Sequence, residues 1–264
     1  VMPRSPRWLF LAGPLLAGCM EMSPFEVDLP AHQRDKTAKN LERLAQRPPP
    51  TGAWRFAVMT DNHQAYDELA EVVDALNQRD DLELVLHGGD LSDVGLKSEL
   101  VWALEELERL RVPWFTVVGN HDALSNGKQL YASMFGPEDY AFEHGSVRFV
   151  CFNSNENEYS GAPRLSWLSD ATRGGSTQTT VALTHVPPDA LKNSYEPTLV
   201  QDRVALALSG HFGGFALRQA QATRFVRVDS VMNERWAEVT VSAESALGLL
   251  ACERGECSPL GGGP

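Results

Sequence analysis

Six side chains that can bind a metal ion each follow a short apolar run in this sequence. They are Asp61, His63, Asp90, Asn120, His185 and His211. Imidazole nitrogen, carboxylate oxygen and amide oxygen form a mixed ligand set, which suits Mn, Fe or Zn better than Mg or Ca, because the latter prefer oxygen alone. The pattern therefore predicts a transition-metal centre.

Each of these signals has a plain structural explanation when it is taken alone. Gly, Asn and Asp commonly form the turn after a strand, and a single histidine is more often hydrogen-bonded within a protein than bound to a metal. A turn gives no reason, however, for histidines to accompany the acidic and amide groups at one strand end after another. Four of the seven histidines do so, namely His63, His121, His185 and His211. We therefore favour metal binding over turn formation alone.

The first half of the chain alternates short apolar runs with longer amphipathic stretches. The runs 54–59, 82–86 and 112–118 are typical of buried strands, and the stretches 66–76 and 99–110 are typical of helices. This order predicts a right-handed β-α-β-α-β unit with parallel strands. The candidate ligands in this half recur about every 30 residues, the length of one such unit. They should therefore meet at the carboxyl edge of the sheet, where open α/β sheets bind their ligands.

The second half of the chain is richer in strands than in helices. Short apolar or alternating segments predict these strands, at residues 140–142, 147–152, 181–184, 204–208, 223–228 and 237–241. We expect one α/β domain over residues 51–254, with a largely β second half.

Taken in order, the motifs D-x-H, G-D-x-x-D, G-N-H-D, H and G-H resemble those of the calcineurin-like metallophosphoesterase superfamily over about residues 55–213. The resemblance implies a four-layer α/β/β/α sandwich of two mixed β-sheets and a site for two divalent metal ions. It also implies where each ligand acts: Asp61 and His63 on the first ion, Asp90 on both, and Asn120, His185 and His211 on the second.

The same resemblance makes His121 the catalytic acid that protonates the leaving oxygen, and Asp93 the carboxylate that pairs with it. Two divalent ions outweigh the charges of Asp61 and Asp90, so the site could hold a phosphate and a metal-bridging hydroxide from a water of lowered pKa. The predicted activity is hydrolysis of a phosphomonoester or a phosphodiester. The alternative is a catalytically weak or inactive protein of the same fold that serves as a binding or scaffold module.

One position departs from the superfamily pattern. Gly213 stands where the final histidine of G-H-x-H would bind the first ion, and glycine offers no side chain. Two unassigned histidines lie in the domain, but His87 is more simply a structural residue on a strand and His144 falls in a predicted hairpin. We therefore expect the first ion to bind more weakly than the second.

The amino terminus has the features of a processed segment. Arg4 and Arg7 precede an apolar stretch that ends in Leu-Ala-Gly-Cys at Cys19 and is too short to span a bilayer. This end resembles the lipobox of bacterial lipoproteins, so we expect residues 1–18 to be a signal peptide and Cys19 to carry a lipid anchor outside the cytoplasm. The alternatives are an ordinary signal peptide with a chance cysteine, or a short buried helix. The polar, proline-containing residues 19–50 would form a tether, with a helical patch that could dock on the domain.

The other cysteines fit an oxidising compartment without proving one. Cys252 and Cys257 flank a turn-like stretch and could form a disulfide, a question that the sequence leaves open. Cys151 lies among apolar residues and is predicted to be a buried free thiol. The tail, residues 255–264, is expected to be flexible.

Composition and charge exclude several classes of protein. The chain has 264 residues, of which 43% are hydrophobic and 22% charged, as in a globular protein. Its net charge of −12 and its lack of a Lys/Arg cluster argue against a nucleic-acid partner. A phosphorylated small molecule or a phosphodiester remains compatible with the acidic chain when metal ions supply the positive charge.

Overall fold

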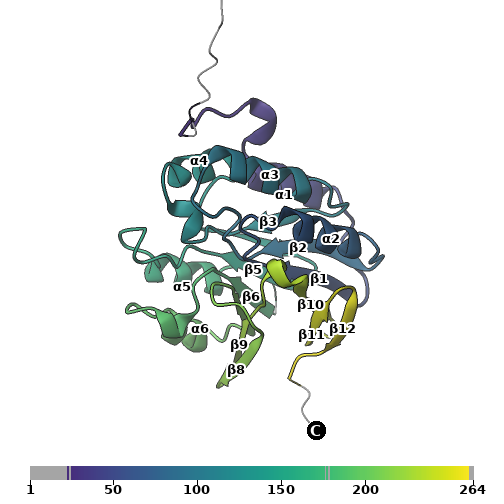
Figure 1. The fold of residues 1–264 in the computed structure, drawn as a ribbon. Helices are drawn as coiled ribbons and strands as arrows, with labels where there is room; N and C mark the ends of the chain where they lie inside the picture. Colours follow the sequence, from purple (N-terminus) through teal and green to yellow (C-terminus); the bar gives the residue numbers. More distant parts are fainter. Residues whose placement is uncertain (1–22, 24, 176, 178, 262–264) are drawn as a thin grey trace, which may run out of the picture.

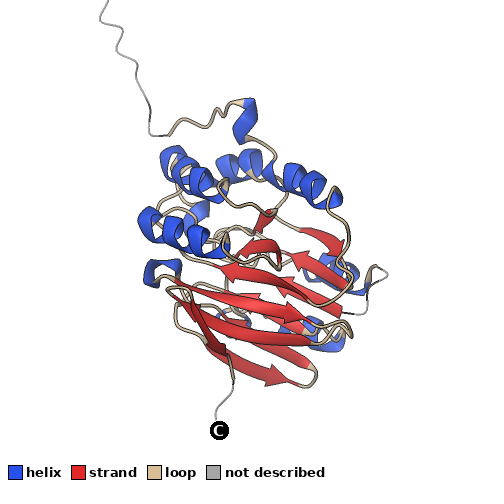
Figure 2. Ribbon diagram, turned by 90° about the vertical axis from the view of Figure 1, so that its right-hand side faces the viewer, coloured by secondary structure: helices blue, strands red, loops and turns tan. Residues whose placement is uncertain are grey.

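Two mixed sheets of six strands each form the centre of this computed structural model, which describes residue 23 and residues 25–261 except 176 and 178 (Figure 1). The sheets lie face to face, with helices on both outer sides (Figure 2). This is the four-layer α/β/β/α arrangement that the superfamily resemblance implied. Among the described residues, no helix combines the length and the apolar character needed to cross a bilayer.

The first sheet has the strand order β12-β11-β10-β1-β2-β3. The parallel strands β1, β2 and β3 come from the predicted β-α-β-α-β unit, and the later strands pair antiparallel. The bounds are Trp54–Met59 for β1, Leu82–His87 for β2, Trp114–Thr116 for β3, Arg235–Val241 for β10, Leu247–Glu253 for β11 and Glu256–Pro259 for β12.

The second sheet has the strand order β4-β5-β6-β7-β9-β8. Its central strands β5, β6, β7 and β9 are parallel, whereas the edge strands β4 and β8 pair antiparallel. The bounds are Tyr140–His144 for β4, Val147–Cys151 for β5, Thr179–Leu183 for β6, Leu206–Ser209 for β7, Ala216–Ala220 for β8 and Thr223–Arg227 for β9.

The helices form the two outer layers. The outer face of the first sheet is covered by α2 to α4 and that of the second by α5 and α6, whereas α1 lies beside the edge strand β3 and contributes Leu44 to the core between the sheets (Figure 1). The α-helices are α1 Lys36–Ala45, α2 Tyr66–Leu76, α3 Lys97–Leu107, α4 Gly127–Met134, α5 Leu165–Arg173 and α6 Glu196–Gln201, with short 3-10 turns η1 Ala31–Gln33, η2 His121–Ala123, η3 Pro188–Ala190 and η4 Val231–Asn233.

Aromatic and aliphatic side chains fill the space between the sheets. Phe56 of β1 meets Phe149 of β5 edge to face, with ring centroids 5.1 Å apart. Phe142 of β4 stacks on the other side of Phe149 at 5.0 Å, and Phe115 of β3 lies 4.2 Å from Phe142. This interior core fixes one sheet against the other, which matters because each sheet carries part of the candidate site.

Most of the predicted strands and the second predicted helix differ from the structure by one to three residues at their ends, and two of these differences have a clear local reason. The second helix begins at Lys97 rather than Glu99, because the Glu99 carboxylate accepts the backbone N–H groups of Val94 and Leu96 and so closes the first turn. β3 is shorter than the predicted strand 112–118, because it pairs with β2 at only three positions, Trp114 to Thr116.

Ordered structure also occurs in the segments predicted as tether and tail. Residues 36–45 of the expected tether fold as α1, where the Asn40 amide oxygen accepts the backbone N–H of Trp114 on the sheet edge. Residues 256–259 of the expected tail form β12, because they pair with β11. Cys19 lies outside the described residues.

The structure answers the two questions about cysteine in the described region. Cys252 and Cys257 form a disulfide that joins β11 to β12. Cys151 is a buried free thiol, as predicted.

Candidate metal centre

All six predicted metal ligands lie in loops that leave the carboxyl ends of parallel strands. The loops after β1, β2 and β3 belong to the first sheet, and those after β6 and β7 belong to the second. Several of these loops turn sharply, with positive φ at Asp61, His63, Asp90 and His211. Such a turn bends the chain just beyond the strand, so that side chains from both sheets face one another.

Four of the predicted ligands meet in one tight cluster. The Asn120 Oδ1 atom lies 3.0 Å from His185 Nε2 and 2.9 Å from His211 Nδ1. The two imidazole nitrogens are 3.2 Å apart, and Asp90 Oδ2 is 3.2 Å from His185 Nε2. These are the residues predicted for the second ion, with Asp90 as the shared ligand. We call this set the second cluster.

A first cluster lies on the other side of Asp90. His63 Nε2 is 3.7 Å from Asp90 Oδ2, and one nitrogen of His121 lies within 4.8 Å of both residues' ligand atoms. His63 and His121 also contact each other edge to face, with ring centroids 4.7 Å apart. Asp90 is therefore common to both clusters, which is the arrangement expected of a bridging carboxylate.

Asp61 lines the same site and is held by its neighbours. Its side-chain oxygens accept the backbone N–H of His211 at 3.0 and 3.2 Å and the hydroxyl of Thr60 at 2.6 Å. Burial raises the pKa of Asp61, and the nearby Asp90 carboxylate adds to this, while His185 opposes it. A cation at the site would keep both carboxylates charged.

The hydrogen bonds of His185 indicate that this site is built for a cation. His185 Nδ1 lies 2.8 Å from the carbonyl oxygen of Gly88, so Nδ1–H donates there and a neutral ring has a lone pair on Nε2. That lone pair faces two oxygen acceptors, Asn120 Oδ1 and Asp90 Oδ2. Three acceptor atoms, His185 Nε2, Asn120 Oδ1 and Asp90 Oδ2, repel one another at these distances. A proton or a metal ion between them would remove this repulsion. Donor atoms that share one ion at bond lengths of about 2.1 Å lie about 3.0–3.4 Å from one another, so the spacing also fits.

The charges of His185 and Asp90 support the same conclusion. Burial alone would lower the pKa of His185, but the adjacent carboxylate of Asp90 raises it above its usual range. Burial alone would raise the pKa of Asp90, but His185 and His63 lower it. The site therefore keeps a negative carboxylate at Asp90 available to a cation.

The predicted catalytic pair lies at the edge of the first cluster. His121 Nδ1 is 2.6 Å from the backbone carbonyl oxygen of Asp93 and 3.6 Å from its carboxylate. The closer contact is thus with the backbone of Asp93. The Asp93 carboxylate also lies 3.5 Å from His63 Nδ1, so its negative charge is close to both His63 and His121.

The loops are tied together by residues that the sequence reasoning did not single out. Asp122 is fully buried and accepts the backbone N–H groups of Gly119 and Ser92 as well as the Ser92 hydroxyl. Gly119 is required here, because a Cβ at this position would lie 2.0 Å from Asp90 Oδ1. Asp122 stands inside the G-N-H-D motif, so its position was visible in the sequence, whereas its hydrogen bonds were not.

Neither unassigned histidine replaces the ligand missing at Gly213. His144 contacts Glu83 at 3.2 Å and packs against Trp54, away from both clusters. His87 is fully buried on β2, and its Nδ1 accepts the backbone N–H of Gly89. Both histidines are structural, as the sequence suggested.

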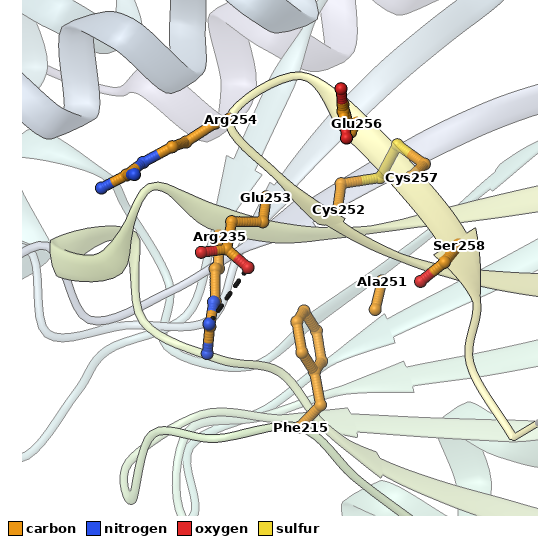
Figure 3. Close-up of a pocket in the computed structure, with 9 residues that line it drawn as sticks. All are labelled: Phe215, Arg235, Ala251, Cys252, Glu253, Arg254, Glu256, Cys257 and Ser258. Carbon is orange, nitrogen blue, oxygen red and sulfur yellow. Dashed lines mark hydrogen bonds and ion pairs between the residues drawn. A yellow bond between two sulfur atoms is a disulfide. The ribbon is translucent and has the colours of Figure 1, made fainter.

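A large open cavity lies apart from both clusters, at the β11–β12 hairpin (Figure 3). Its volume is about 690 Å³, and none of the predicted ligands lines it; the lining residues are Phe215, Arg235, Ala251, Cys252, Glu253, Arg254, Glu256, Cys257 and Ser258. The cavity is large, but it lacks the convergent donor atoms of the metal centre. Arg235 connects the two regions, because it pairs with Glu253 at the cavity and with the buried Asp229 on the other side.

The fold and the paired clusters are those expected of a metal-dependent phosphoesterase, and comparison with known proteins agrees. Residues 55–213 match the calcineurin-like phosphoesterase family, and the chain belongs to that family. It is a metal-dependent hydrolase of phosphoric esters.

One curated relative and two solved structures are similar to this chain. The chain is 28% identical over 183 residues to a 3',5'-cyclic-nucleotide phosphodiesterase of Nostoc sp., a match that covers 62% of this chain and 68% of the relative. Two solved structures share the fold at low identity. GAP50, the anchor in the inner membrane complex of Plasmodium, has a TM-score of 0.65 at 14% identity, with 79% of this chain and 89% of that chain covered. The purple acid phosphatase PPD1 of yellow lupin seeds has a TM-score of 0.64 at 13% identity, with 81% and 54% covered.

Proposed function

We propose that this protein hydrolyses a phosphodiester at a centre of two divalent ions, which Asp90 bridges. The observation that carries the proposal is that Asp90 belongs to both clusters, so one carboxylate joins two groups of ligand atoms. The similarity to a cyclic-nucleotide phosphodiesterase favours a diester over a monoester. The mixed nitrogen and oxygen ligands favour Mn, Fe or Zn.

The ions would supply Lewis acidity toward the phosphate and an activated water for in-line attack. Asp61 and His63 would hold the first ion, and Asn120, His185 and His211 the second. The carbonyl oxygen of Gly88 keeps the His185 ring oriented, because it accepts the Nδ1 proton and so leaves Nε2 for the ion.

His121 is the proposed proton donor to the leaving oxygen. Its Nδ1–H donates to the Asp93 carbonyl oxygen, which leaves Nε2 as the atom that can pass a proton to the ester. The backbone N–H of His121 donates to Asp90 Oδ1 at 2.9 Å, so the position of the acid is coupled to the bridging carboxylate. The exposure of the His121 side chain, 37%, leaves it accessible to a substrate.

The glycine at position 213 supports the expectation that the first ion binds more weakly than the second. It supplies no ligand atom, and the only group near the place of its missing Cβ is Asp229 Oδ1, at 3.6 Å. That oxygen already accepts the backbone N–H groups of Gly214 and Ser230. We propose that the first ion has fewer protein ligands than the second and binds less tightly.

The decisive experiment measures turnover and metal content together. Purified protein is assayed with a chromogenic phosphodiester and a phosphomonoester in the presence of Mn, Zn or Fe, and His121→Gln is compared with the parent. We expect the parent to prefer the diester and His121→Gln to lose about 10²–10⁴-fold in kcat, the usual contribution of a general acid, with unchanged metal content.

The exposed surface substitution Trp102→Ala serves as the control and should leave both readouts unchanged. A loss of metal from His121→Gln would make His121 a ligand rather than the acid. Absence of turnover with every metal, in a protein that still binds two ions, would favour the binding or scaffold role instead.

We also propose that the protein is anchored by lipid at Cys19, outside the cytoplasm. The order of basic residues, apolar run and small residues before Cys19 supports this proposal. Release of Cys19→Ser from the membrane fraction, with the parent retained there, would support it, and equal distribution of the two would contradict it.

A further inference from the structure

An exposed aromatic ring lies against the second cluster. Phe212 directly follows His211, and its ring centroid is 4.4 Å from that of His211. Its exposed fraction is 57%, although phenylalanine contributes to stability mainly when it is buried. The ring therefore borders the proposed metal centre without being part of a core.

A guanidinium group accompanies this ring. The Arg227 Cζ atom lies 5.9 Å from the centroid of Phe212. Arg227 is held in place because its Nε–H donates to the carbonyl oxygen of Gly214, in the same loop as Phe212. An aromatic face beside a fixed guanidinium is a surface on which a planar ring can stack.

Other apolar side chains stand on the neighbouring loops. Of the eight large hydrophobic side chains that are exposed among the described residues, three lie in or directly after the loops that carry the predicted ligands. These three are Val94, Leu124 and Phe212. Isolated exposed apolar residues are common, so Phe212 stands out by its contact with His211 and not by its exposure alone.

We propose that Phe212 is the stacking surface for an aromatic ring in the substrate, so that the substrate is a nucleoside phosphodiester. This inference rests on the proposed function and adds the class of organic group that the site accepts. Phe212 is an exposed aromatic ring in direct contact with a predicted metal ligand, so a base stacked on it would lie near a phosphate held at the metal centre.

The test compares substrates that differ only in the base. A nucleoside 3',5'-cyclic phosphate and a nucleoside 5'-methyl phosphodiester are each paired with the same ester lacking the base. For Phe212→Leu, we expect KM to rise about tenfold for the base-bearing esters, the size of one lost stacking contact, with kcat within about twofold. The esters without a base should be unaffected, and Phe212→Trp should retain the parent KM.

Leu217→Ala is the matched control. Leu217 is an exposed apolar residue on β8, 39% exposed, that lies outside the proposed site. Leu217→Ala should leave KM and kcat unchanged for both pairs of substrates. If Phe212→Leu affects esters with and without a base equally, Phe212 does not recognise an aromatic ring and the inference is wrong while the phosphodiesterase proposal stands. Faster hydrolysis of a phospholipid diester than of any nucleoside ester would also overturn it.

Binding measurements separate this inference from the proposed function. Calorimetric titration of the Mn-loaded parent with a nucleoside monophosphate should give a Kd about tenfold tighter than that of Phe212→Leu. If the parent turns over no ester but shows this difference, the nucleotide site stands and the hydrolytic proposal fails. If it shows neither turnover nor nucleotide binding, both fail.

Discussion

Asp90 is the residue on which the two-ion arrangement depends. It is buried, with 2% exposure, and it has ligand atoms of both clusters around it. A carboxylate in this place would normally favour its neutral form, but the histidines around it lower its pKa and keep it charged. The same negative charge would attract the divalent ions.

The first prediction concerns the ligand missing at Gly213. Gly213 has φ +60°, a value that is strained for most residues, but His63 and His211 in this protein already adopt positive φ. Because a Cβ at position 213 meets no close neighbour, Gly213→His should fold and bind the first ion about tenfold more tightly, as measured by metal titration.

Gly213→Ala is the control for this change, because it brings the same backbone strain without a ligand. It should bind metal as the parent does, or slightly more weakly. Equal metal affinity of Gly213→His and Gly213→Ala would show that position 213 does not face the first ion.

At the scale of elements, the segment between β9 and η4 holds two loops of the site together. The Ser230 hydroxyl donates to the carbonyl oxygen of Asp61 at 2.7 Å, and the backbone N–H of Gly214 donates to Asp229 Oδ1 at 2.7 Å. Arg235 of β10 fixes the other oxygen of the Asp229 carboxylate at 2.7 Å. The loops after β1 and β7 are therefore positioned by a third element that offers no ligand itself.

The second prediction follows from this connection. Asp229→Ala leaves the backbone N–H groups of Gly214 and Ser230 and the guanidinium of Arg235 without their acceptor. We expect activity or metal affinity to fall about 10–100-fold, as is usual when the support of a metal ligand is removed, with the circular dichroism spectrum unchanged.

Glu253→Gln provides the comparison, because Glu253 is the exposed partner of the same arginine. It should retain nearly full activity, since exposed ion pairs contribute little. An Asp229→Ala protein with parental activity and metal content would show that the loops keep their positions without this carboxylate.

At the scale of the whole molecule, the core between the sheets sets the distance between the halves of the site. Asp61, Asp90 and Asn120 come from the first sheet, and His185 and His211 from the second. No local interaction can bring these groups together. Their approach depends on the packing of the two inner faces, in which Phe149 lies near the centre.

The third prediction tests this packing. Phe149 is 1% exposed and contacts aromatic rings of both sheets, so Phe149→Ala should lower the free energy of unfolding by about 3–5 kcal/mol. Urea denaturation of the metal-free protein measures this directly. Leu217→Ala, on the surface, should change it by no more than about 0.5 kcal/mol. A loss below about 1 kcal/mol for Phe149→Ala would mean that the sheets are held together elsewhere.

Local features were predictable from the sequence because they depend on neighbouring residues. The strand 54–59 and the helix 66–76 were predicted with the bounds that β1 and α2 have in the structure, since periodicity and buried runs are properties of a short stretch. The strands β8, β11 and β12 were missed. β8 and β12 are largely exposed edge strands without a continuous apolar run, whereas β11 has such a run, residues 247–252, that was not assigned to a strand.

The sequence by itself determined which residues could bind metal and that they would follow strand ends. The resemblance implied that Asp90 would be shared and that Asn120, His185 and His211 would group together. Only the tertiary structure decided the distances between these atoms and that the Cys252 and Cys257 sulfurs would pair. The physical reason is that these distances join residues on different strands or sheets. They are set by how the buried faces pack, which no short stretch of sequence encodes.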